Sequence, residues 1–223
     1  MAATIMLHSA DTVTIPKQQI LRYAGIAGGE APEGVDNLIK KYIPVFLESA
    51  KFRACYLEVP VQIDGDVVDF DCMKVKSHNL SALLNGCDRA ILVAATVGIA
   101  VDMIIKRAEV MSKAEALILN SIAIAGIEQY MGMLNEFFAS QYTGKALRPR
   151  YSPGYGDVPL EVQKDLLRIL DTNRKIGVAL SDSLLMTPSK SVSAFIGIGS
   201  EGCTNIDKDC DLCSKRECEY RLT

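Results

Sequence analysis

Four cysteines near the C-terminus have a spacing that could hold a metal ion. Cys203, Cys210, Cys213 and Cys218 form a C-x6-C-x2-C-x4-C pattern within the last 21 residues. The close C-x2-C pair can bind one metal from a tight turn, and the other two thiolates complete a set of four ligands. The spacing matches no standard signature. Zinc, an iron–sulfur cluster and a reduced segment without metal therefore all remain open.

A second group of residues, Arg150–Pro159, combines a cation with a tight bend. Its sequence is RYSPGYGDVP. Pro153 and Gly154 favour a turn, and glycine lets the backbone approach a ligand closely. Arg150 can donate two parallel hydrogen bonds to a carboxylate, and Tyr155 can stack on a ligand or bond to it. The residue types alone also allow a structural loop in which Arg150 pairs with a nearby carboxylate.

The residues that follow this loop have an order that resembles a known family. An amphipathic helix is followed by Ile176–Ser183 (IGVALSDS), Met186–Pro188 and Ser191–Ala194. Together with Arg150–Pro159, this order resembles the activation domain of cobalamin-dependent methionine synthase, in its stand-alone form. That family shows Arg-Pro-x-Pro-Gly-Tyr-Pro, a helix, a Thr-Glu-Ser element, Met-x-Pro and Ser-Val-Ser-Gly. The match is collinear over about 45 residues.

The resemblance implies a binding site for S-adenosylmethionine. Arg150 stands where the family's arginine contacts the ligand, Tyr155 at the tyrosine of Pro-Gly-Tyr, and Ser152 at the small residue between them. Glu128, on a predicted long helix, takes the place of the family's helix glutamate. A carboxylate there would neutralise the ammonium or sulfonium group of the ligand. A solvated residue where the apolar helix becomes polar is the alternative for Glu128.

The resemblance also implies a function. In that family the cobalt of methionine synthase is occasionally oxidised to inactive cob(II)alamin, and the activation domain positions S-adenosylmethionine over the corrinoid. An electron donor, expected to resemble flavodoxin or ferredoxin, reduces the cobalt, which then takes the methyl group. The chain is too short to hold corrinoid, folate and homocysteine modules. We therefore expect a methyltransferase component whose partner, methionine synthase or another corrinoid protein, holds the cobalamin.

The four cysteines have a place in this scheme. An iron–sulfur cluster beside the corrinoid could relay the electron, whereas zinc could only stabilise the fold. A function of a different class also remains open. In that case the chain is a non-catalytic metal-binding adaptor, and the loop at Arg150 is purely structural.

The chain departs from the family pattern in several places. Tyr151 and Gly156 stand where the family usually has proline. Phe195–Gly199 and the cysteines replace an aromatic-rich strand and loop, and the family's N-terminal ligand-binding aspartate has no counterpart. Weaker similarity to the family occurs at Ile20–Gly25 and Ala95–Asp102.

The fold that positions these residues is expected to be α+β, with mixed helices packed on a twisted, largely antiparallel sheet. Apolar periodicity predicts helices at 18–23, 35–52, 98–109, 113–138 and 160–170, and Ser77 is the expected N-cap of a further short helix. Strands are predicted at 90–97, 176–180 and 192–198, with a hairpin over 54–76 that turns at Asp64-Gly65. No pattern is evident in residues 1–12. We expect one domain over 1–200 and a cysteine-rich tail over 201–223.

Composition excludes several classes of protein. The 223 residues carry a net charge of -3, no tryptophan and no basic stripe, so nucleic acid is not an expected partner. The apolar stretches Ala90–Val101 and Ala116–Ile127 are shorter than the roughly 20 residues that span a bilayer, and we expect them to be buried. With no signal peptide evident, we place the protein in the cytoplasm. Cys55, Cys72 and Cys87 are expected to be small core residues.

Overall fold

The computed structural model describes residues 2–26 and 31–200. Its centre is a five-stranded sheet with the strand order β1-β2-β6-β10-β7, in which every pair of neighbours is antiparallel. These strands are β1 (Thr4–His8), β2 (Phe52–Pro60), β6 (Cys87–Thr96), β10 (Ser191–Ser200) and β7 (Lys145–Leu147). The predicted α+β class and the antiparallel sheet are confirmed.

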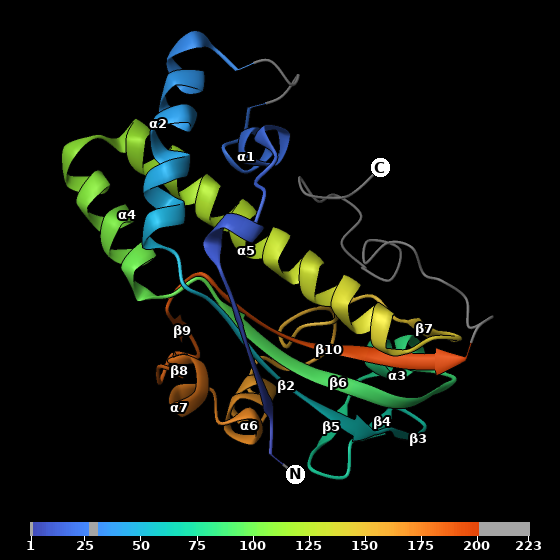
Figure 1. Ribbon diagram of the computed structural model, residues 1–223. Helices are drawn as coiled ribbons and strands as arrows, with labels where there is room; N and C mark the ends of the chain where they lie inside the picture. Colours follow the sequence, from blue (N-terminus) through green and yellow to red (C-terminus); the bar gives the residue numbers. More distant parts are fainter. Residues whose placement is uncertain (1, 27–30, 201–223) are drawn as a thin grey trace.

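Helices cover the sheet on both faces (Figure 1). One layer contains α1 (Lys17–Tyr23), α2 (Glu33–Ser49), α4 (Ile99–Met111) and the long α5 (Lys113–Gln141). The other layer contains α3 (His78–Leu83), α6 (Val162–Leu170), α7 (Thr172–Ile176) and a small sheet of β3 (Gln62–Asp64), β4 (Val67–Asp69) and β5 (Lys74–Lys76). A short 3-10 helix (Ala10–Thr12) and the pair β8 (Ala179–Leu180) and β9 (Met186–Thr187) complete the elements.

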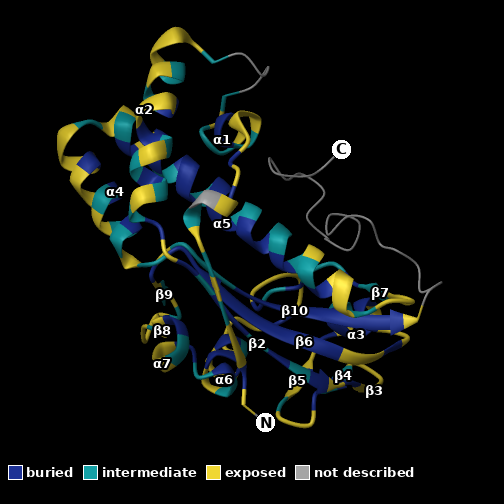
Figure 2. Ribbon diagram, in the orientation of Figure 1, coloured by how far each residue is buried: buried dark blue, intermediate teal, exposed yellow. Residues whose placement is uncertain are grey.

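The central strands separate two apolar cores. Ile91 and Val93 of β6 belong to the core under α5, whereas Ala90 and Leu92 belong to the core on the opposite face, together with Phe195 of β10. This division follows from the strand period of two, which sends successive side chains to opposite faces. Figure 2 shows β6 and β10 as buried along most of their length. The sheet is therefore covered on both sides and provides a rigid base for the loops at its ends.

Helix α5 is the central helix of its layer. Its Tyr130 is fully buried and its ring lies 5.1 Å from that of Phe52, centroid to centroid. In the part of the chain that the structure describes, α5 is the one helix long and apolar enough to cross a membrane, and 61% of its apolar window is buried inside the protein. That burial is typical of a core helix, in agreement with the expectation for residues 116–127.

Several local predictions are confirmed. The short helix α1, the long helix α5 and the amphipathic α6 lie where apolar periodicity placed them. Ser77 is the N-cap of α3, since its Oγ accepts a hydrogen bond from Leu80 N at 3.0 Å. The hairpin predicted over 54–76 is confirmed only for β3 and β4, because residues 52–60 form β2 and pair with β1 and β6 instead. Its turn is formed by Gly65 and Asp66, one residue later than predicted. Gly65 adopts a φ of 57°, which suits glycine at this turn.

Other local predictions are wrong. Residues 4–8, which showed no pattern, form β1, an edge strand with only one partner. The helix predicted over 35–52 ends at Ser49, because Phe52 turns inward as the first residue of β2. The strand predicted over 176–180 is mostly absent, since α7 extends to Ile176 and Gly177 ends it in the left-handed region. Cys55 and Cys87 are buried as expected, but Cys72 is exposed.

Candidate functional site

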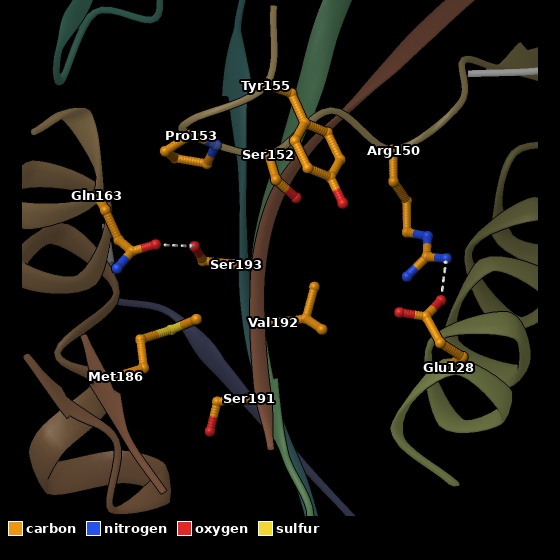
Figure 3. Close-up of a pocket in the computed structure, with 10 residues that line it drawn as sticks. All are labelled: Glu128, Arg150, Ser152, Pro153, Tyr155, Gln163, Met186, Ser191, Val192 and Ser193. Carbon is orange, nitrogen blue, oxygen red and sulfur yellow. Dashed lines mark hydrogen bonds and ion pairs between the residues drawn. The ribbon is translucent and has the colours of Figure 1, made fainter. Parts of the chain in front are cut away.

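The four residues predicted to bind a ligand line one pocket (Figure 3). The cavity has a volume of about 260 Å³ and lies between α5, the loop after Leu147, α6 and the start of β10. It is lined by Glu128, Arg150, Ser152, Pro153, Tyr155, Gln163, Met186, Ser191, Val192 and Ser193. Side chains far apart in the sequence therefore meet at one end of the sheet.

An ion pair forms the charged side of the pocket. Arg150 Nη2 lies 2.9 Å from Glu128 Oε2, and the two side chains are 22% and 35% exposed. The pairing brings a guanidinium and a carboxylate to the same rim. Because a guanidinium carries five N–H donors in a fixed fork, this single contact leaves others able to face the cavity. One edge of the pocket thus offers both signs of charge to a ligand.

The loop that carries Arg150 is fixed to the sheet at Tyr151. Tyr151 N donates to Phe195 O at 2.9 Å, and Phe195 N donates to Tyr151 O at 2.8 Å. Beyond this bridge the chain turns at Pro153-Gly154, with Gly154 at a φ of 87° and Tyr155 N donating to Ser152 O at 3.1 Å. The predicted bend is confirmed. It presents Ser152 and the Tyr155 ring to the cavity.

The opposite side of the pocket carries polar groups that are already bonded. Ser193 Oγ donates to Gln163 Oε1 at 3.3 Å, and Gln163 Nε2 donates to Leu184 O at 3.2 Å. Ser191 Oγ donates to Pro188 O at 2.7 Å. These bonds fix the side-chain orientations before any ligand arrives. Pre-formed polar groups of this kind give a binding site its specificity.

Sequence reasoning missed part of this lining. Met186, Ser191 and Ser193 belong to the motif segments that carry the resemblance, so the motif was a signal that could have identified them. Gln163 had no such signal, because it lies within a helix that was noted only as amphipathic.

Tyr23 of α1 is a further residue near the pocket. Burial, and next the negative charge of Glu128, raise the pKa of Tyr23 above its ordinary value, so the phenol lies within electrostatic reach of the pocket carboxylate. Helix α1 is tied to α5 by a hydrogen bond from Gln129 Nε2 to Gln19 Oε1 at 2.9 Å. The similarity noted at Ile20–Gly25 therefore belongs to the neighbourhood of the site.

The predicted metal ligands Cys203, Cys210, Cys213 and Cys218 lie outside the described residues. Within residues 2–26 and 31–200, no three His, Cys, Asp or Glu side chains are grouped as metal ligands would be. The buried Cys55 is a poor nucleophile, because burial raises the pKa of its thiol to about 12. Cys55 and Cys87 therefore contribute packing, whereas Cys72 is exposed.

Comparison with known proteins agrees with this geometry. Residues 128–203 match the family model of the vitamin B12 dependent methionine synthase activation domain, and this range includes all ten residues that line the pocket. No curated protein matches the chain. A crystal structure described as the MetH reactivation domain bound to AdoHcy has the same fold, with a TM-score of 0.66, 15% sequence identity, and coverage of 92% of this chain and 80% of that chain. Residues 128–203 therefore resemble the activation domain of vitamin B12-dependent methionine synthase, and the chain as a whole shares the fold of the MetH reactivation domain.

Proposed function

We propose that this chain binds S-adenosylmethionine in the pocket at Arg150 and thereby supports the reductive reactivation of a cobalamin-dependent methionine synthase. The observation that carries the proposal is the Arg150–Glu128 pair, 2.9 Å apart at the rim of a cavity whose lining lies within residues 128–203, the range that matches the family model. The related crystal structure is described as holding AdoHcy, the demethylated form of this ligand.

The residues present fit such a ligand. Its amino-acid end is a zwitterion, and Arg150 can donate hydrogen bonds to the carboxylate while Glu128 attracts the ammonium. Tyr155 offers a ring face for stacking, and the turn at Pro153-Gly154 brings backbone groups of Ser152 close to the cavity. Each of these groups binds or orients the ligand, and none needs to exchange a proton with it.

The methyl group of the bound ligand is the one supplied to the reduced cobalt of the corrinoid. In this proposal the partner, methionine synthase or another corrinoid methyltransferase, holds the cobalamin, and a flavodoxin- or ferredoxin-like protein in the cytoplasm donates the electron. The contribution of this chain is the positioning of the ligand, which replaces a bimolecular encounter by an oriented one. The chain acts as a component of the methyltransferase.

The binding step is tested by calorimetric titration of the full chain with S-adenosylhomocysteine. We expect Arg150→Ala to weaken binding by roughly 10- to 100-fold, because a hydrogen-bonded charge pair is worth about 1.5–3 kcal/mol. Arg168→Ala is the matched control, since Arg168 is an exposed arginine paired with Asp165 on α6 and does not line the pocket. A wild-type chain that binds nothing would contradict the proposal and favour the metal-binding adaptor.

We also propose that Cys203, Cys210, Cys213 and Cys218 hold an iron–sulfur cluster or zinc. Four thiolates in this spacing can complete one metal site. Iron, sulfide and zinc should be measured in anaerobically purified full chain and in a Cys210→Ser, Cys213→Ser variant. Iron with sulfide in the wild type alone supports an electron relay, whereas one zinc and no sulfide would limit the site to a structural role.

A further inference from the structure

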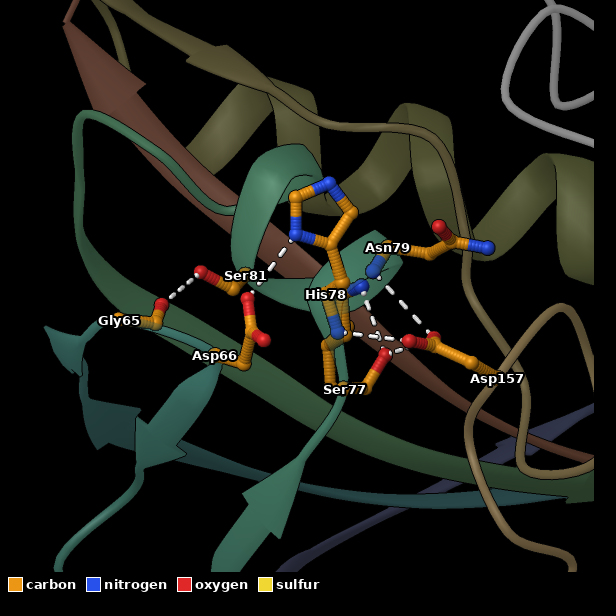
Figure 4. A network of polar contacts seen from close by, with 8 residues as sticks. Gly65, Asp66, Ser77, His78, Asn79, Ser81 and Asp157 are labelled. Atoms are coloured by element: carbon orange, nitrogen blue, oxygen red, sulfur yellow. Dashed lines mark hydrogen bonds and ion pairs between the residues drawn. The ribbon is translucent and has the colours of Figure 1, made fainter.

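Asp157 joins the pocket loop to helix α3 (Figure 4). Its carboxylate accepts hydrogen bonds from the Ser77 hydroxyl, from His78 N at 2.7 Å and from Asn79 N at 3.3 Å. The first N–H groups of a helix have no partner inside the helix, so an outside carboxylate satisfies them well. Partial burial raises the pKa of Asp157, but these hydrogen bonds outweigh it and hold the pKa below its ordinary value. The contact is therefore fully formed at neutral pH.

Gly156, the residue before Asp157, is fitted closely to the same place. It has a φ of 52°, and a Cβ there would overlap Tyr151 Oη and Asn79 Nδ2. The two departures from the family pattern in this loop, Tyr151 and Gly156, are thus one structural feature. The absence of a side chain at 156 leaves the space that the Tyr151 hydroxyl occupies.

A series of side-chain contacts links the region of Gly156 and Asp157 to the pocket. The Tyr151 side chain is buried, and its ring lies edge-on to the ring of Tyr155, with centroids 6.3 Å apart and an interplanar angle of 87°. Tyr155 itself is 58% exposed. Ser152 and Tyr155 lie between the bridge at Tyr151–Phe195 on one side and Asp157 on the other. The position of the pocket-facing part of the loop therefore depends on these two ends.

We propose that Asp157 is a positioning residue, which fixes Ser152 and Tyr155 in the pocket by binding the start of α3. The proposal rests on the proposed function, since ligand affinity is one of its two readouts. The other readout is the rate of backbone hydrogen exchange in the loop, which does not depend on a ligand. Asp157 lies outside the pocket lining, so its effect on a ligand must pass through the loop.

The test compares Asp157→Ala and Asp157→Asn with the wild type in the full chain. We expect hydrogen exchange of the backbone over residues 150–158 to be about tenfold faster in Asp157→Ala, because the loop loses the hydrogen bonds that tie it to the start of α3. S-adenosylhomocysteine should bind about tenfold more weakly, which corresponds to about 1.4 kcal/mol. Asp157→Asn keeps one acceptor oxygen and should retain part of both properties.

Asp66→Asn is the matched control, because the Asp66 side chain also contacts the first residue of α3, through His78 Nδ1 at 2.9 Å, and this contact does not involve the loop over residues 150–158. Both readouts should equal those of the wild type. Unchanged loop exchange in Asp157→Ala would overturn the proposal, as would an equal loss of affinity in Asp66→Asn. If Asp157→Ala does not fold, Asp157→Asn provides the same comparison. If the wild type binds no S-adenosylhomocysteine, the proposed function fails, and the exchange rates alone decide whether Asp157 anchors the loop.

Discussion

The two walls of the pocket are held in place in different ways. Ser191 and Ser193 stand on β10, which pairs with β6 along almost its whole length and has apolar cores on both faces. Ser152 and Tyr155 stand on a loop that is fixed by one β-bridge and by the contacts of Asp157. The sheet wall is specified by many contacts and the loop wall by few. Changes in the sheet should therefore reduce stability, and changes in the loop should reduce binding.

The largest expected effect comes from the sheet wall. Phe195 of β10 is fully buried and stacks on Phe70, with centroids 5.1 Å apart and rings 10° from parallel. Phe195→Ala should lower the free energy of unfolding by about 3–5 kcal/mol. Urea denaturation measures this change. Tyr155→Ala, on the loop wall, should change the free energy of unfolding by less than about 1 kcal/mol while weakening ligand binding. Similar losses of stability in the two variants would remove the distinction between the walls.

The next largest effect is expected at Gly156, where a comparison with Gly177 distinguishes steric crowding from backbone strain. Gly156 and Gly177 both have positive φ, 52° and 74°, but a Cβ at Gly177 meets nothing within 4 Å. Gly156→Ala should cost about 1–3 kcal/mol more than Gly177→Ala, because the new methyl group meets Tyr151 and Asn79. Thermal unfolding measures the loss of stability, and titration with S-adenosylhomocysteine measures the effect on ligand binding.

A second change can relieve the part of the crowding that involves Tyr151, while the contact with Asn79 remains. Adding Tyr151→Phe to Gly156→Ala removes the hydroxyl that the new Cβ would meet. The double variant should therefore be more stable than the sum of the single changes predicts. Strict additivity would show that the two residues are not coupled.

The smallest expected effect lies on the far side of α3. A hydrogen bond to Asp66 raises the pKa of His78 above its ordinary value of 6.5. The His78–Asp66 contact therefore stabilises the fold fully below that pH, and the stabilisation is lost as the pH rises through the higher folded pKa. Titration by NMR should show the raised pKa in the wild type and a lower pKa in Asp66→Asn. Identical titration curves would exclude the contact.

The sequence predicted the elements whose apolar period is long and regular. Helix α5 and strand β10 lie close to their predicted bounds, because buried side chains repeat over many residues there. Strand β1 was not predicted, because an edge strand of five residues with mostly exposed side chains shows no clear alternation. Residues 176–178 looked like a strand because Ile176 and Val178 are β-branched, but both are buried through the end of α7 and the turn at Gly177.

The sequence predicted those residues of the candidate site that belong to the family motif. Arg150, Ser152 and Tyr155 could be assigned because their spacing repeats a family pattern, and the structure places Glu128 beside them. The contacts of Asp157 with α3 could not be predicted, because they join residues about 80 positions apart that no local pattern connects. A short contact between distant segments is a property of the folded chain, and only its three-dimensional structure shows it.

The central claim is tested most directly by methyl transfer to a corrinoid protein. A cobalamin-dependent methionine synthase without its own activation region is oxidised to the cob(II)alamin form and supplied with a reductant and S-adenosylmethionine labelled in its methyl group. We expect the wild-type chain to restore activity and to place the label on the corrinoid. Arg150→Ala should do so at least about tenfold less well under subsaturating ligand. Equal recovery of activity without this chain would show that it has no part in reactivation.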